Sequence, residues 1–91
     1  MLKYKMLLYN LTTDIKIRGV DVKISYKKLW MILIQRDITK VTMRRDLGIA
    51  AGTMSKLNKG EEVSLSVLLR ICDYLRCDIG DICEAVRADE E

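Results

Sequence analysis

Two different periodicities divide the chain near Ser25. Over residues 14–24 apolar and charged residues alternate, with one slip of phase at Gly19. Alternation with period two is typical of a strand, and the slip predicts a bulged strand or a tight hairpin. Residues 2–6 alternate in the same way and could pair with it. The alternative is a solvated leader, so we describe residues 1–23 as an N-terminal arm, either a β strand or hairpin or an upstream extension.

From Ser25 onward the apolar positions recur every three or four residues, which predicts helices. The second predicted helix ends at Gly48, which accepts the left-handed conformation, and the third opens at Ile49. The residues that we expect to cap the other four helices are Ser25, Thr39, Ser64 and Asp78. The apolar residues that we expect to face the core are Tyr26, Leu29, Trp30 and Leu33, then Met43 and Leu47, then Ile49, Met54 and Leu57, then Val67, Leu68, Ile71, Cys72 and Leu75, and finally Ile79, Ile82, Cys83 and Val86.

These elements predict an all-α fold of five short helices. The chain has 91 residues, which suffices for one domain with a short accessory segment but leaves no mass for a deep substrate cavity with a lid. We place the domain at residues 24–86, after the arm at residues 1–23 and before an acidic tail at residues 87–91.

Several absences exclude most chemistry. The sequence contains no histidine, the commonest general base and metal ligand. The spacing of Cys72, Cys77 and Cys83 matches no zinc site, so we interpret them as small buried apolar residues in a reducing compartment. The first ten residues are too short and too often interrupted by lysine for a signal peptide or a membrane span. We therefore expect a cytoplasmic protein that is not an enzyme and has no cofactor, metal, membrane partner or small-molecule substrate.

The net charge of +3 conceals a division along the chain. Residues 1–60 carry 13 Lys and Arg against 4 Asp and Glu, whereas residues 61–91 carry 3 against 9. An excess of positive charge in the first part indicates an anionic partner for that part.

Residues 40–59 indicate where the anionic partner binds. Two short predicted helices meet at Gly48, with apolar positions spaced so that both pack on one core. This is the spacing of a helix-turn-helix, whose second helix enters the major groove of DNA. The segment resembles the helix-turn-helix of phage Cro and repressor proteins, also called the xenobiotic response element (XRE) family. The resemblance covers residues 24–86, and the matching segments are residues 24–30, 37–40, 47–49, 56–59 and 67–82.

The sequence departs from the family pattern in two places. Arg44 lies four residues before the turn glycine, where the family prefers alanine, so either the angle between the helices differs or the arginine side chain extends outward. Ala50, Ala51 and Gly52 occupy positions where many relatives carry Ser or Gln. Small residues there leave few side-chain donors, but they let the backbone approach the groove closely.

The resemblance implies DNA-binding residues on both helices. On the third helix, next to the small residues Ala50 and Gly52, the expected base readers are Ala51, through contact with a thymine methyl group, and Thr53, Ser55 and Lys56, through hydrogen bonds. The residues expected to contact phosphates are Lys40, Thr42, Arg45 and Lys59. The leader and first helix would extend this phosphate footprint if they lie on the same side, and we expect the acidic C-terminal part to face away from DNA.

The function that follows is a sequence-specific double-stranded DNA-binding transcriptional regulator of the phage-repressor-like type. We expect a repressor that binds an operator as a homodimer, because two recognition helices must reach successive major grooves. Leu65 and Leu69 lie off the main apolar stripe and are either ordinary exposed leucines or a self-association patch. The alternative is a protein-interaction module, such as the antitoxin of a toxin–antitoxin pair.

Overall fold

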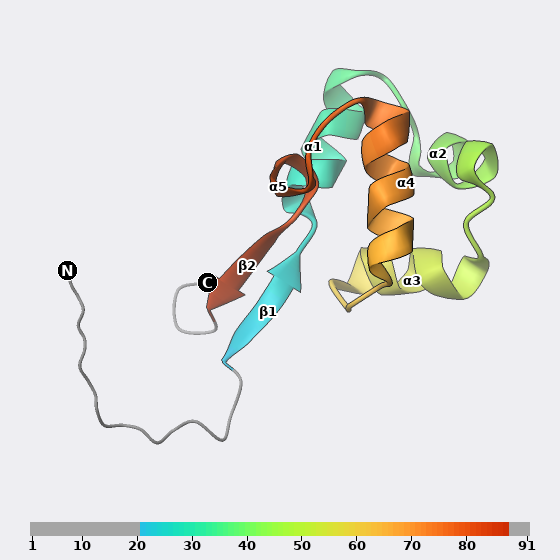
Figure 1. Ribbon diagram of the computed structural model, residues 1–91. Helices are drawn as coiled ribbons and strands as arrows, with labels where there is room; N and C mark the ends of the chain where they lie inside the picture. The colour runs from blue at the N-terminus through green and yellow to red at the C-terminus, as the bar shows by residue number, and fades with distance from the viewer. Residues whose placement is uncertain (1–20, 88–91) are drawn as a thin grey trace, which may run out of the picture.

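The computed structural model describes residues 21–87, which form five helices and two short strands (Figure 1). In chain order these elements are β1 (Val22–Ser25), α1 (Lys27–Gln35), α2 (Lys40–Leu47), α3 (Ala51–Lys59), α4 (Leu65–Leu75), α5 (Ile79–Ile82) and β2 (Glu84–Arg87). The predicted five-helix fold is confirmed. The predicted alternation at residues 2–6 and most of the predicted arm and acidic tail lie outside the described residues.

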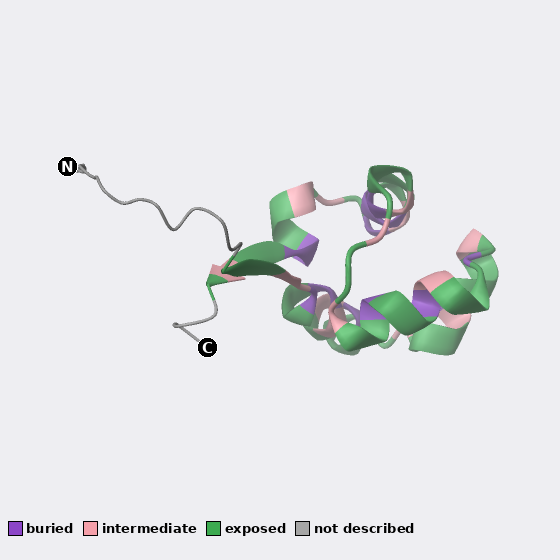
Figure 2. Cartoon of the chain, turned by 90° about the horizontal axis from the view of Figure 1, so that it is seen from below, coloured by how far each residue is buried: buried purple, intermediate pink, exposed green. Residues whose placement is uncertain are grey.

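Each helix contributes apolar side chains to one core, with α4 at its centre. Buried positions occupy the inward sides of the helices, and exposed positions occupy the outward sides (Figure 2). Full burial of a leucine or isoleucine side chain stabilises a fold by about 1.5–3 kcal/mol, so this core is the main source of stability. The most deeply buried large side chains are Leu29, Met43, Leu57, Ile71, Leu75 and Ile82.

The cysteines belong to this core or to its edge. Cys72 and Cys83 are buried, Cys77 is half-buried, and all three are free thiols. Burial is the main cause that raises the pKa of each thiol. The interpretation of these residues as buried apolar side chains is therefore confirmed for Cys72 and Cys83.

Three of the four predicted caps are confirmed. The Thr39 hydroxyl accepts a hydrogen bond from the Thr42 N–H at 3.0 Å, and the Ser64 hydroxyl accepts one from the Val67 N–H at 3.2 Å. Asp78 forms a reciprocal capping box with Asp81 at the start of α5. These side chains satisfy backbone donors that have no partner within their own helix.

The prediction that Ser25 caps the first helix is wrong. Ser25 ends β1, and Tyr26 is the N-cap of α1 without a side-chain cap bond. The Ser25 hydroxyl still accepts a hydrogen bond from the Lys27 N–H at 3.3 Å. Pairing of β1 with a second strand keeps Ser25 extended, and the helix therefore begins later than the hydrophobic stripe indicates.

The predicted fifth helix is also too long. The helix ends at Ile82, and Cys83 is extended with φ −153° and ψ 165°. Cys83 and Val86 therefore do not share a helical face with Ile79. Residues 84–87 form β2 instead, which includes Arg87 from the predicted tail. Periodicity failed here because a single helical turn is too short to distinguish from the end of a longer helix.

β1 and β2 pair as an antiparallel ribbon, with Val22 opposite Arg87 and Ser25 opposite Glu84. The predicted strand near residue 24 is present, and among residues 21–87 its partner is the C-terminal strand. The predicted bulge or hairpin at Gly19 lies outside the described residues. The pairing satisfies backbone groups that a lone strand would leave open.

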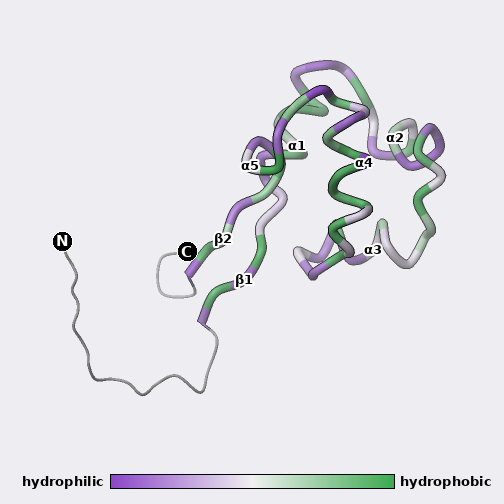
Figure 3. The backbone as a smooth tube through the Cα atoms, viewed as in Figure 1, coloured by the Kyte–Doolittle hydropathy of each residue, from purple (hydrophilic) through white to green (hydrophobic). Residues whose placement is uncertain are grey.

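Hydropathy differs strongly between the helices. In Figure 3 α4 is mostly hydrophobic, whereas α2 includes a strongly hydrophilic stretch. The longest helix, α4, has 11 residues. Among residues 21–87, no helix is both long and apolar enough to cross a membrane.

Candidate DNA interface at the helix-turn-helix

The turn between α2 and α3 is built on Gly48. This residue has φ 64° and ψ 35°, a left-handed conformation that costs other residues about 1–2 kcal/mol. A Cβ atom at this position would meet nothing within 4 Å, so the backbone conformation and not the available space requires glycine. The Gly48 N–H and the Ile49 N–H both donate to the Arg44 carbonyl, the latter at 3.0 Å. The predicted turn at Gly48 is therefore confirmed.

Arg44 also holds the far side of this turn. Its Nε donates to the Ile49 carbonyl at 3.1 Å, so Arg44 and Ile49 are joined by one bond in each direction. Arg44 is exposed, and its side chain bonds to the turn instead of pointing only into solvent. The first departure from the family pattern thus reinforces the turn.

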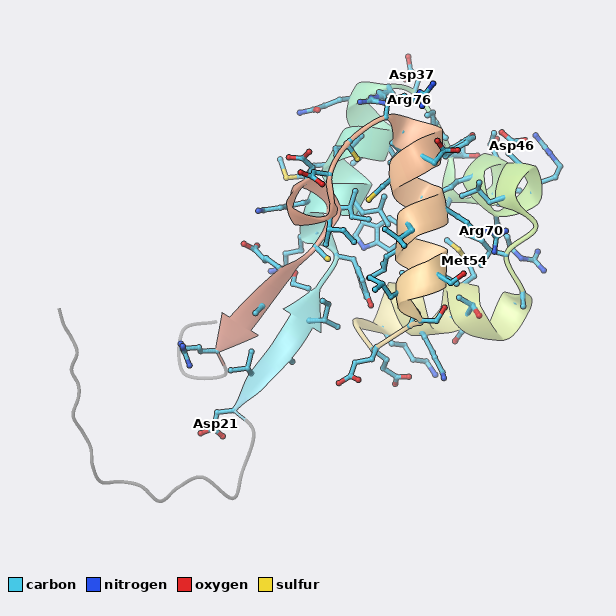
Figure 4. The ribbon with its side chains drawn as sticks, viewed as in Figure 1. Asp21, Asp37, Asp46, Met54, Arg70 and Arg76 are labelled. Carbon is cyan, nitrogen blue, oxygen red and sulfur yellow. The ribbon has the colours of Figure 1, made fainter. Side chains whose placement is uncertain are left out.

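Two side chains from α4 attach to the same turn. Arg70 donates to the Leu47 carbonyl, and the Tyr74 hydroxyl donates to Asp46 Oδ2 at 2.6 Å. Figure 4 shows Asp46 on α2 and Arg70 on the side of α4 that faces it. The hydrogen bond to Asp46 is the main cause that raises the pKa of Tyr74, because it requires the protonated hydroxyl.

α3 begins at Ala51, two residues later than predicted, and its N-cap is Ala50 with φ −63° and ψ 151°. No side chain accepts a hydrogen bond at this end of the helix. The first backbone N–H groups of α3 and the positive end of its dipole are therefore left for solvent or an external anion. The small residues Ala51 and Gly52 are exposed beside them, and a Cβ atom at Gly52 would meet nothing within 4 Å.

The polar side chains of α3 form one exposed stripe. The exposed residues Gly52, Ser55, Lys56 and Lys59 recur at helical spacing, whereas Met54 and Leu57 are buried against the core. Ala50 and Ala51 are also exposed. Thr53 is half-buried at the edge of the stripe, so it is less open than the sequence suggested. The other predicted base readers thus lie together on the outward face.

The predicted phosphate contacts on α2 have partners inside the molecule. Lys40 Nζ donates to Asn58 Oδ1 at 2.9 Å and lies 4.0 Å from the centre of the Trp30 ring. Thr42 is half-buried, and its hydroxyl accepts a hydrogen bond from Thr39 at 2.9 Å. Lys40 therefore links the start of α2 to the end of α3, a contact that nothing in the sequence spacing reveals.

Arg45 is exposed, and its Nε lies 4.0 Å from Asp46 Oδ1. Asp46 is the single carboxylate within residues 40–59, and Tyr74 already engages it. An exposed pair of this kind contributes little to stability. The positive charge of Arg45 and of the two lysines on α3 therefore dominates this surface.

Three acidic residues of the C-terminal part lie away from this surface. Asp78 caps α5, Asp81 lies in α5 and Glu84 begins β2, and α4 stands between α5 and α2 in Figure 1. Lys28 on α1 lies on this acidic side, with its Nζ 3.7 Å from Glu84 Oε1. The division of charge along the sequence is thus only partly a division in space, because Glu61 and Glu62 directly follow the basic end of α3. Residues 21–87 contain no group of three or more potential ligands that could hold a metal ion.

Comparison with known proteins agrees with this geometry. Residues 28–88 match the Cro/C1-type helix-turn-helix DNA-binding domain, which covers more than half of the chain. The chain belongs to the Cro/C1-type helix-turn-helix family. A crystal structure of the transcriptional regulator VanUg (form II) is similar to it, with 48% sequence identity and a TM-score of 0.75. The similarity covers 78% of this chain and 95% of VanUg. A comparison with curated proteins found no match.

Membership of the Cro/C1-type family confirms the resemblance inferred from the sequence. The matched residues 28–88 include α2 and α3, so both helices belong to a helix-turn-helix DNA-binding domain. The sequence analysis missed Arg70 and Tyr74, which hold the turn. It also missed Asn58, the partner of Lys40. Only Arg44 carried a signal, because it departs from the family pattern.

Proposed function

We propose that this Cro/C1-type protein is a sequence-specific regulator of transcription that binds double-stranded DNA at an operator. The exposed stripe on α3 is the observation that carries the proposal. It joins an uncapped helix start with small residues to a basic end at Lys56 and Lys59, while the carboxylates of α5 lie across the molecule. An N-terminus of this kind favours phosphate, and a helix of nine residues fits the major groove.

The residues divide by role. Ala51, Thr53, Ser55 and Lys56 read base edges, with Ala50 and Gly52 allowing close approach of the backbone. Lys40, Thr42, Arg45 and Lys59 contact phosphates and position the helix without selecting a sequence. Lys40 makes its phosphate contact while Asn58 and Trp30 orient its ammonium group.

Selection of bound sequences from a random duplex pool, followed by gel shifts in rising salt, tests the proposal. We expect one enriched site whose affinity exceeds that for random duplex at every salt concentration. Thr53→Ala and Ser55→Ala should each reduce discrimination at one base pair by about 1–3 kcal/mol. Lys59→Ala should weaken all sequences about equally. Binding that never exceeds the level for random duplex would contradict the proposal.

The proposed mode of action is repression by a homodimer that places two α3 helices in successive major grooves. Leu65 and Leu69 support a self-association surface, because they lie one turn apart on α4 and are 62% and 53% exposed. Sedimentation equilibrium of wild type and of Leu65→Ser/Leu69→Ser tests this point. A dimer that persists unchanged in the variant would place the interface elsewhere.

The same exposed leucines favour the second candidate, a protein-interaction module such as an antitoxin. Co-purification from the native host distinguishes the two functions. A stoichiometric partner that is lost in Leu65→Ser/Leu69→Ser, together with no enriched DNA site, would favour the interaction module. Recovery of the chain alone together with an enriched site would favour the regulator.

A further inference from the structure

A groove of about 340 Å³ lies between the β ribbon and the C-terminal end of α3. Its lining includes Lys23 on β1, Lys27 at the start of α1, and Asn58 and Lys59 at the end of α3. Among the residues that the structure describes, three lysines and no carboxylate line this groove. The charged part of its lining is therefore positive and favours an anion, while Ile24, Trp30, Leu57 and Val86 make other parts of the lining apolar.

Two contacts fix the walls of the groove relative to each other. The buried Tyr26 donates its hydroxyl hydrogen bond to the Glu61 carbonyl at 2.8 Å, which ties the β1–α1 junction to the segment after α3. A Cβ atom at Gly60 would lie 3.7 Å from the Ile24 carbonyl, so the two backbones are close. The ribbon is thus held against the end of the recognition helix.

Lys59 belongs to both surfaces. It is the last residue of the exposed stripe on α3, and it also lines the groove. Lys59 lies seven positions after Gly52, so the stripe extends about 10 Å before the groove begins. The groove is therefore the direct continuation of the proposed DNA-binding face and not a separate pocket.

Lys28, the neighbour of Lys27 in the chain, has different surroundings. It does not line the groove, and its Nζ donates to the Gly80 carbonyl at 3.0 Å, on the side of α5. Lys27 thus lies in a basic environment and Lys28 in an acidic one, although the two residues are adjacent on α1. This pair offers a matched comparison with the same residue type, the same helix and the same change of charge.

We propose that the groove binds backbone phosphates of the DNA duplex, with Lys23 and Lys27 as phosphate-contacting residues beside Lys59. The inference rests on the proposed function and extends it to the ribbon, which lies outside the helix-turn-helix. Lysine acts as a point charge on a flexible stem, so it suits contact with phosphates that lie beyond the reach of α3. The contacts add affinity and orientation without sequence choice.

The test measures affinity for a labelled duplex of random sequence by fluorescence anisotropy over a range of salt concentrations. Each lost phosphate contact should reduce the slope of log K against log salt by about 0.9, which corresponds to a five- to tenfold loss of affinity at about 0.1 M salt. We expect this change for Lys23→Gln and for Lys27→Gln, and about twice the change of slope for the double variant. Lys28→Gln should retain the slope of the wild type.

Thermal unfolding of each variant separates binding from folding, since all of these side chains are exposed. Equal losses of duplex affinity in Lys27→Gln and Lys28→Gln would show an effect of net charge and overturn the proposed role of the groove. Duplex binding that is unchanged in Lys23→Gln/Lys27→Gln would overturn it while leaving the proposed function intact. A wild-type chain that binds no duplex at all would overturn both.

A second titration uses inorganic phosphate alone and follows the amide resonances of Lys27 and Lys59. Small shifts that do not saturate are expected, because one phosphate cannot span the groove and the stripe together. Saturating shifts that match those produced by duplex DNA would assign the groove to free small anions and overturn the proposal.

Discussion

The residues that precede α3 and α4 have almost the same backbone geometry, but only one of them caps its helix with a side chain. Ala50 has φ −63° and ψ 151°, and Ser64 has φ −66° and ψ 150°. Ser64 accepts a hydrogen bond from the helix it precedes, whereas Ala50 has no side-chain acceptor to offer. The backbone thus enters α3 and α4 in the same conformation. The type of residue at the N-cap decides whether the backbone N–H groups of the first turn bond within the chain or stay open to an external partner.

At the C-terminal ends, the relaxed backbone belongs to the helix-turn-helix and the strained backbone belongs to α4. The helix-turn-helix ends both of its helices with left-handed glycines, Gly48 and Gly60. α4 ends at Arg76, which adopts φ 55° and ψ 54° without being glycine. The helix-turn-helix therefore minimises strain at its ends and leaves the start of α3 unsatisfied, while α4 is capped at its start and strained at its end.

The largest expected effect concerns the hydrophobic core that α3 and α4 share. Leu57 on α3 is 1% exposed and Ile71 on α4 is 0% exposed. Leu57→Ala and Ile71→Ala should each lower the free energy of unfolding by about 2–5 kcal/mol, because each leaves a cavity in the same core. Urea unfolding measures both. A cost below about 1 kcal/mol for Leu57→Ala alone would mean that α3 depends on its turn and not on the core.

The next effect tests the helix ends. Gly48→Ala should lower the free energy of unfolding by about 1–2 kcal/mol, since the added methyl group meets no atom and only the backbone is strained. Arg76→Gly should raise it by up to about 1 kcal/mol for the same reason. Denaturation midpoints at unchanged m-value give both numbers. A destabilised Arg76→Gly would show that the arginine side chain compensates for its backbone strain.

The helix starts are compared by adding the same charge to each. Ala50→Asp should weaken duplex binding by about tenfold or more, because the carboxylate occupies the open N–H groups and repels phosphate. The same change should stabilise the fold by about 1 kcal/mol through capping. Ser64→Asp is the control, since it keeps a cap and adds the same charge. Equal loss of binding in both variants would remove any special role for the start of α3.

The smallest effect concerns the bond that ties α4 to α2. The pKa of Tyr74 is raised mainly by its hydrogen bond to Asp46, so the folded state holds this proton above pH 10, where the unfolded chain loses it. The resulting stability is present below pH 10 and is lost as pH rises through the folded pKa. Thermal midpoints of wild type should fall more steeply above pH 10 than those of Tyr74→Phe. Parallel curves would mean that this bond contributes nothing to stability.

Local signals in the sequence predicted the elements that depend on local interactions. Thr39, Ser64 and Asp78 cap helices through hydrogen bonds to residues no more than three positions away, and Gly48 ends α2 through its own backbone conformation. The core positions followed from helical periodicity. Membership of the family was visible for the same reason, because its segments have fixed spacing along the chain.

Interactions between distant residues were not predictable. The partner of β1 lies about sixty residues later in a segment whose alternation is too short to separate from a helix. The contact of Lys40 with Asn58 and the contact of Tyr74 with Asp46 join different helices and leave no periodic trace. Ser25 was misassigned because the sequence shows a good capping residue but not the distant partner strand that keeps Ser25 extended.

The β1–β2 register also closes the described chain into a ring. Val22 lies opposite Arg87, and facing Cα atoms in an antiparallel pair are about 4.5–5.5 Å apart, a gap that a linker of a few residues can bridge. A circular permutant that joins these positions and opens new ends elsewhere should therefore retain the helical body. Probes attached at either position would report from nearly the same point in space.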